Sequence, residues 1–127
     1  MTQALRTARE VVELYNRVVW NEQDFTLAKE LFADEVVRHG VDEVVTLTRE
    51  QAVRRIEDLC ATVDRVHFAL PVVVAGDDDE HVAIVYQAEM TRHDGTADAI
   101  ASIEVFRVVD GRITEVYNNT HQHGVWR

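Results

Sequence analysis

The sequence has few of the residues on which several enzyme classes depend. Its 127 residues include a single cysteine, Cys60, so no disulfide can form within the chain. Serine and lysine also occur once each, and the five glycines are isolated from one another. These absences exclude a glycine-rich phosphate loop and a Gly-x-Ser-x-Gly nucleophile elbow. Because so little cysteine is typical of a reducing compartment, we expect a cytoplasmic protein.

Long apolar segments and basic clusters are also missing. No apolar run approaches the roughly 18 residues that a membrane span needs, and residues 1–7 lack the apolar core of a signal peptide. The net charge is −10, which repels phosphate backbones, so neither nucleic acid nor membrane is an expected partner. A hydrophobic fraction of 46% supplies a packed core, and the length is typical of a single domain covering residues 1–127.

Apolar spacings of three and four residues predict helices in the first half of the chain. The first runs from about Leu5 to Val19 and has a capping box at Thr7. Asp24 is a plausible N-cap for a short second helix. Thr48 begins the third with another capping box, and Ile56 lies on its inward face.

The pattern then changes to strands. Residues 36–39 form a short strand, and after residue 63 the strands 66–75, 81–92, 97–109 and 112–121 follow one another. Pro71 places the strand that contains it at a sheet edge or a bulge. Asp94-Gly95 and Asp110-Gly111 predict hairpin turns. Helices followed by a meander of strands indicate the α+β class.

Particular segments resemble a known family. Residues 11–15, 20–21, 31–34 and 38–40 are similar to the opening of a SnoaL-like or ketosteroid-isomerase-like domain, and residues 103–115 are similar to its final hairpin. The resemblance covers nearly the whole chain and is specific for the nuclear-transport-factor-2-like superfamily. It implies a cone-shaped fold, in which three N-terminal helices pack on a strongly bent, mainly antiparallel sheet that encloses a pocket.

Strand alternation predicts which residues face that pocket. A two-residue turn at Asp94-Gly95 would pair His93 with Thr96 and place residues 87 and 89 on the same face as residues 102 and 104. A three-residue loop at residues 109–111 would bring residues 116 and 118 to that face. The expected pocket-lining residues are Val19, Phe32, Ile56, Gln87, Glu89, Ser102, Phe106 and Val116.

The resemblance also implies roles for four residues. Tyr15 matches the oxyanion-hole tyrosine of ketosteroid isomerases, and Glu104 matches their protonated carboxylic acid; together they would stabilise an enolate. His39 lies at or beside the position of the aspartate base, although Gly40 falls there without a one-residue gap. Asn118 stands where many SnoaL-like cyclases carry an aspartate, and it would orient the substrate. The residues alone also allow a core tyrosine, a glutamate paired with an arginine, and a histidine bonded to the backbone.

The opposite sheet face is nearly all apolar and contains Ile84, Tyr86, Ile103 and Val105. An exposed apolar face of that size promotes aggregation, so we expect a homodimer through this convex face.

The resulting hypothesis is a cofactor-independent acid/base enzyme of the isomerase, cyclase or lyase type. Its partner would be a small apolar molecule, a carbonyl-bearing ring compound such as a polyketide or steroid. The alternative is a non-catalytic small-molecule-binding or dimeric interaction domain of the same fold. No cofactor is expected. No metal is expected either, because His121 and His123 point the same way on a strand but a third ligand is not evident.

Overall fold

The computed structural model describes residues 5–127, so the first four residues of the segment inspected for a signal peptide lie outside it. The N-terminal helix is continuous but changes character along its length: α1 spans Ala8–Leu14, the π-helical η1 spans Tyr15–Val19, and α2 spans Trp20–Glu22. The predicted capping box at Thr7 is present. The helix ends at Gln23, which has a left-handed backbone with φ of 53°.

Two further helices follow as predicted. Helix α3 spans Phe25–Leu31, and the Asp24 side chain caps it by accepting a hydrogen bond from the Leu27 N–H at 3.0 Å. Helix α4 spans Arg49–Cys60 and begins with the predicted capping box at Thr48. In residues 5–127, no helix is long and apolar enough to cross a membrane.

The seven strands form one sheet. They are β1 Phe32–Gly40, β2 Glu43–Thr48, β3 Val63–Ala75, β4 His81–Arg92, β5 Ala97–Val109, β6 Arg112–Asn118 and β7 Gln122–His123. The order is β2-β1-β6-β5-β4-β3, and β7 pairs with β5. Strands β1 and β6 are parallel, and every other pairing is antiparallel. Pro71 lies in the edge strand β3 beside a register shift, as its missing N–H predicts.

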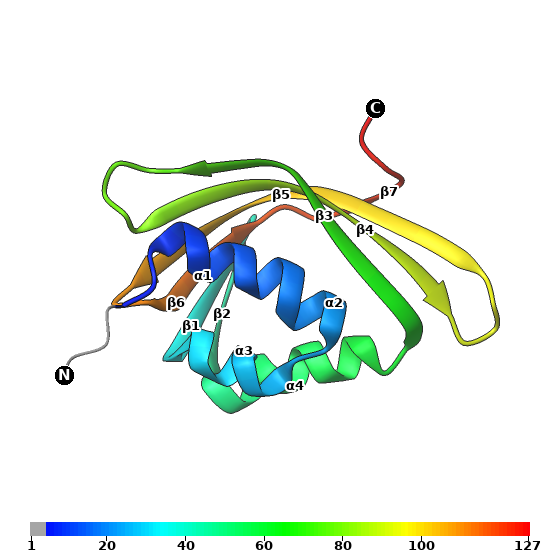
Figure 1. The fold of residues 1–127 in the computed structure, drawn as a ribbon, viewed down its shortest axis with the longest axis horizontal. Coiled ribbons are helices and arrows are strands. Elements are labelled where there is room, and N and C mark those ends of the chain that lie inside the picture. Colours follow the sequence, from blue (N-terminus) through cyan, green and yellow to red (C-terminus); the bar gives the residue numbers. More distant parts are fainter. Residues whose placement is uncertain (1–4) are drawn as a thin grey trace.

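The sheet is strongly curved, and all the helices lie on its concave side (Figure 1). The hydrophobic core fills the space between them and includes Val12, Leu31, Ile56, Phe106 and Ile113. The α+β class and the cone-shaped, mainly antiparallel architecture are therefore confirmed.

The predicted two-residue turn between β4 and β5 is wrong. The Arg92 N–H donates to the Thr96 carbonyl at 2.9 Å, so the loop holds three residues, and Gly95 within it has φ of +87°. One extra residue shifts the register by one position, which exchanges the two faces of β4. Ile84 consequently lies opposite Glu104, and Tyr86 lies opposite Ser102.

The second hairpin differs from its prediction in another way. Val109 pairs with Arg112, which leaves a two-residue turn with positive φ at Asp110 (52°) and Gly111 (75°). The register then shifts between Ile113 and Glu115, because Thr114 is an extra residue in a β-bulge. The bulge offsets the shorter turn. Asn118 therefore lies opposite Glu104, and Val116 lies opposite Phe106, on the face that was predicted.

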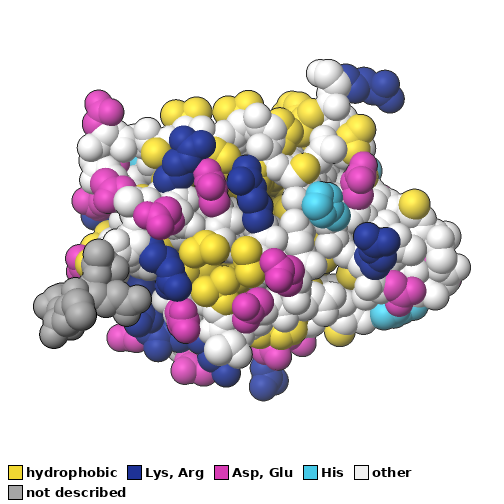
Figure 2. Space-filling view, viewed as in Figure 1, with side chains coloured by type: hydrophobic (Ala, Val, Ile, Leu, Met, Phe, Trp, Pro, Cys, Tyr) yellow, Lys and Arg dark blue, Asp and Glu magenta, His cyan; other side chains and the backbone are white. Residues whose placement is uncertain are grey.

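The register of β4 also corrects the predicted dimer face. Ile84 and Tyr86 are only 1% and 4% exposed, because they point to the concave side beneath the helices. The outer side instead presents Val74, Ile103 and Tyr117, each more than 40% exposed. Hydrophobic side chains gather along the upper edge of the view in Figure 2, and acidic and basic side chains are interspersed below them.

Candidate functional site

A cavity of about 290 Å³ opens between the concave face of the sheet and the helices. Such a volume lies at the small end of the range for ligand pockets. Its apolar walls come from several elements and include Trp20, Val66, Phe68, Met90 and Ile100. Its polar groups are fewer: the deep ones are Tyr15, Arg38, Arg55, Tyr86, Glu104 and Asn118. The site thus combines apolar surface with a small number of charged and hydrogen-bonding side chains.

Glu104 is a buried carboxyl group on the polar side of the cavity. It is 8% exposed, and its Oε2 accepts a hydrogen bond from Asn118 Nδ2 at 3.0 Å. Arg38 Nη2 lies 3.9 Å from the same oxygen. Burial raises the pKa of Glu104 above its usual value, while the charges of Arg38 and Arg55 and the Asn118 hydrogen bond offset part of that rise. A carboxyl group with a raised pKa exchanges its proton at a higher pH than an ordinary glutamate does.

Tyr15 is held among aromatic rings at the π-helical turn. Its ring makes edge contacts with Phe32 and Phe106, at centroid distances of 5.4 and 5.7 Å. Burial raises the pKa of Tyr15, so its hydroxyl stays protonated and remains a hydrogen-bond donor. The π-helical turn η1 begins at Tyr15, and Trp20, which follows it, lines the cavity with its ring at a centroid distance of 6.4 Å from that of Tyr15.

Three of the four residues given roles by the resemblance line this cavity: Tyr15, Glu104 and Asn118. Asn118 Oδ1 is buried and has no hydrogen-bond partner among residues 5–127. A buried polar atom of this kind is costly unless something else completes its hydrogen bonds. Asn118 is therefore placed to receive a donor from a bound molecule.

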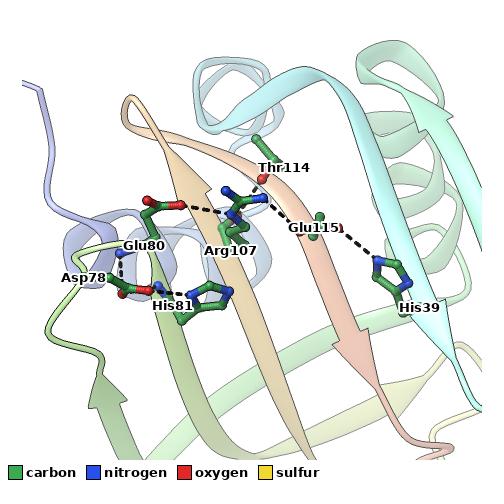
Figure 3. Close-up of polar contacts among 7 residues, drawn as sticks. All are labelled: His39, Asp78, Glu80, His81, Arg107, Thr114 and Glu115. Carbon is green, nitrogen blue, oxygen red and sulfur yellow. Dashed lines mark hydrogen bonds and ion pairs between the residues drawn. The ribbon is translucent and has the colours of Figure 1, made fainter.

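His39 does not join them. Successive strand residues point to opposite faces, and on β1 it is Arg38 that turns inward. His39 Nε2 instead lies 3.1 Å from Glu115 Oε1, and its ring stacks on Tyr117 at a centroid distance of 4.3 Å. Figure 3 shows this pair on the outer face of the sheet, where Glu115 also contacts Arg107. The expectation that His39 points into the cavity is wrong.

The predicted wall residues are only partly in place. Gln87 and Glu89 lie on the opposite face of β4, because the three-residue loop exchanges the faces of that strand. Ser102 is buried opposite Tyr86 but does not line the cavity. The others are buried in the core and do not line the cavity either: Val19, Phe32, Ile56, Phe106 and Val116.

Sequence reasoning missed both arginines of the cavity, although a signal for each was present. Arg38 alternates with His39 and shares its strand face with the buried Val36. Arg55 follows Ala52 by three residues and precedes Leu59 by four, so it lies on the same side of α4 as that inward stripe. A charged residue at an inward position is unusual enough to be taken as a site candidate.

The mouth of the cavity is lined by polar residues near the C-terminal tail. Asp98 Oδ2 accepts a hydrogen bond from Arg92 at 2.7 Å, and His123 Nδ1 lies 3.2 Å from the other oxygen. These contacts lower the pKa of Asp98 to about 2, which makes it a weak base. Residues 5–127 contain no group of three or more His, Cys, Asp or Glu side chains arranged to hold a metal ion.

Comparisons with solved structures show where this fold recurs. SalBIII, described as an epoxide hydrolase/cyclase-like enzyme in pyran ring formation in the polyether salinomycin, has 25% identity and a TM-score of 0.76, over 94% of this chain and 95% of that one. IdmH, a putative polyketide cyclase from Streptomyces antibioticus, has 18% identity and a TM-score of 0.76, over 92% and 93%. An epoxide hydrolase from M. tuberculosis has 17% identity and a TM-score of 0.74, over 92% and 81%.

Sequence comparison gives the family itself. No curated protein sequence matches the chain at a significant level. The family model of the SnoaL-like domain matches residues 11–116, which include most of the first helix, strands β1 to β5, most of β6, and both Tyr15 and Glu104. The chain therefore belongs to the SnoaL-like domain family.

Proposed function

We propose that this protein is a cofactor-independent acid/base enzyme that moves a proton on a small, apolar, carbonyl-bearing ring compound. The observation that carries the proposal is the buried Glu104, whose pKa is raised, in one cavity with the protonated hydroxyl of Tyr15. The cyclase and epoxide hydrolase structures with the same fold support this class of chemistry. The geometry of this cavity changes one role, because the base inferred from the resemblance, His39, lies outside it.

Glu104 takes over the role of the base. In its ionised form it removes a proton from the carbon next to the substrate carbonyl, and the electron pair moves into an enolate. The Tyr15 hydroxyl donates a hydrogen bond to the enolate oxygen, which carries the developing charge. Glu104 then returns the proton to another carbon in an isomerase. In a cyclase, the enolate carbon attacks a second carbonyl, and the oxygen of that carbonyl takes the proton from Glu104. In a lyase, the electron pair of the enolate expels a leaving group from the adjacent carbon, and the leaving group takes that proton.

The direct test is proton exchange on simple cyclic ketones. The protein should speed the loss of the C–H signals next to the carbonyl of 2-tetralone in D₂O, measured by NMR. It should also speed the conversion of cyclohex-3-enone to its conjugated isomer, measured by ultraviolet absorbance. Binding of these ketones without either reaction would favour the alternative, a domain that only holds a ligand.

Tyr15→Phe should lower the rate about tenfold to a hundredfold, because the enolate oxygen loses one hydrogen-bond donor while Arg38 remains nearby. The change removes only the hydroxyl, so the edge contacts with Phe32 and Phe106 stay in place. Tyr117→Phe is the matched control, since Tyr117 lies on the outer face and is 44% exposed. An unchanged rate in Tyr15→Phe would rule out the donor role.

We also propose that a second copy of the chain covers the outer face of the sheet. Val74, Ile103 and Tyr117 are exposed there, and Arg107 is paired with Glu80 and Glu115 on the same sheet. Arg107 offsets part of the negative charge of these two carboxylates, which reduces the repulsion between two copies across this face.

Sedimentation should show a dimer at micromolar concentration, and Ile103→Glu should convert it to a monomer. Leu59→Glu, a matched change at a residue of α4 that is 45% exposed on the helical side of the sheet, should leave the dimer intact. A wild-type monomer at high concentration would contradict the proposal.

We further propose that residues 1–127 form a single domain and that the protein is cytoplasmic, where Cys60 stays reduced.

A further inference from the structure

Two arginines in the cavity have almost no partners. Arg38 comes from β1 and Arg55 from α4, and both line the cavity. Within residues 5–127, the one ion pair of Arg38 is its 3.9 Å approach to Glu104, and the Arg55 guanidinium makes neither an ion pair nor a hydrogen bond. By contrast, Arg49, Arg92 and Arg107 bind carboxylates at 2.6–2.9 Å.

The charges near these arginines do not balance. The Arg38 side chain is only 19% exposed, and Glu104, the one buried acidic residue among residues 5–127, has its pKa lowered by both guanidiniums. When Glu104 takes up a proton, the two guanidiniums are left without a buried anion beside them in a partly desolvated site. Such an arrangement costs free energy unless an anion supplies the missing charge. Since the protein as a whole carries a charge of −10, this local excess of positive charge stands out against its surroundings.

The groups around the pair add a second indication of a ligand. Tyr15 and Tyr86 keep their protons, because burial raises the pKa of both, so they cannot act as the missing anions. Asn118, which lines the same part of the cavity, has a buried Oδ1 without a partner. When Glu104 is protonated, the two guanidiniums lack a buried anion and Asn118 Oδ1 lacks a hydrogen-bond donor, and a bound molecule can supply both.

We propose that the substrate is an acid, whose carboxylate is bound by Arg38 and Arg55 while its apolar part packs against Trp20 and Phe68. A guanidinium matches a carboxylate with two parallel hydrogen bonds, which a neutral amide of the same shape cannot reproduce. This inference rests on the proposed use of the cavity as a substrate site. It adds to that proposal the class of compound, a ring compound with a carboxylate besides its reacting carbonyl.

A matched pair of probes tests the charge requirement. Calorimetry should show that 2-naphthoate binds about tenfold or more tightly than 2-naphthamide, since the two differ in charge but hardly in shape. Arg38→Gln and Arg55→Gln should each weaken the binding of the naphthoate about tenfold and change that of the naphthamide much less. Arg54→Gln is the control, because the neighbouring Arg54 is exposed on α4 and its loss changes the net charge equally.

Three results would overturn the inference. These are equal affinities for the acid and the amide, no binding of the naphthoate at millimolar concentration, or an Arg54→Gln effect as large as the effect of Arg55→Gln. Unchanged melting temperatures would show that the variants are folded. Because binding needs no turnover, the two proposals can fail separately. A preference for the acid without proton exchange rejects only the enzyme, and exchange on neutral ketones without that preference rejects only the carboxylate site.

Discussion

Replacing Glu104 with glutamine should lower the rate of proton exchange about a hundredfold or more, although the shape of the cavity stays nearly the same. The amide keeps the size of the side chain and can still donate a hydrogen bond, but it cannot take up a proton. Glu104→Ala should lose at least as much. If glutamine preserved more than a tenth of the rate, Glu104 would act as a hydrogen-bond donor and the base would have to be another group.

The pH dependence gives an independent check on the same residue. Only ionised Glu104 accepts a proton, so kcat/KM should rise with pH as the carboxyl group ionises, at a pH above the ordinary range for glutamate. Arg38 lowers the pKa of Glu104, and its loss in Arg38→Gln should therefore move this rise to higher pH. If kcat/KM of Arg38→Gln rises at the same pH as that of the wild type, the titrating group is not close to Arg38.

Controls separate loss of chemistry from loss of fold. Glu115→Gln makes the same chemical change on the outer face and should leave the rate within about twofold, since surface changes of this kind have small effects. The pKa of Glu104 is raised in the folded state, so its stabilising contribution is present at acid pH and is lost as pH rises through that pKa. Glu104→Gln should accordingly melt at the wild-type temperature or above it at pH 8, and this advantage should shrink on acidification.

Phe106→Ala should reduce the free energy of unfolding by about 3–5 kcal/mol, measured by urea denaturation. Phe106 is 1% exposed and lies between Val82 and Val116 in the sheet, with its ring against Tyr15 at 5.7 Å. Alanine removes the ring and leaves a cavity in the core that the surrounding strands can close only in part. The loss is a large share of the roughly 5–15 kcal/mol by which a domain of this kind is stable.

The same substitution should also affect function, because Tyr15 loses one of the rings that hold it in position. Val41→Ala is the comparison, since Val41 is 80% exposed and its truncation should cost less than about 0.5 kcal/mol. A cost below about 1 kcal/mol for Phe106→Ala would mean that the strands around it collapse into the space. The core would then be far more adaptable than its close packing indicates.

Local patterns in the sequence determined much of the fold. The capping boxes at Thr7 and Thr48 and the cap at Asp24 are short-range hydrogen-bond patterns, and each begins a helix where it was predicted. Pro71 cannot donate a backbone hydrogen bond, and it lies in an edge strand. The resemblance also identified Tyr15, Glu104 and Asn118, which the structure brings to one cavity.

Only the tertiary structure decided which strand faces line that cavity. One residue in the β4–β5 loop exchanges the faces of β4, so Ile84 and Tyr86 point inward and Gln87 points outward. The left-handed backbone at Gly95 and the bulge at Thr114 fix the registers of the two hairpins, and the packing of the whole sheet favours this backbone geometry. On β1, the parallel pairing with β6 is made between segments far apart in the chain, and there Arg38 faces the cavity while His39 faces out. Spacing along the chain records which residues alternate, but the face that meets the helices depends on contacts between distant segments.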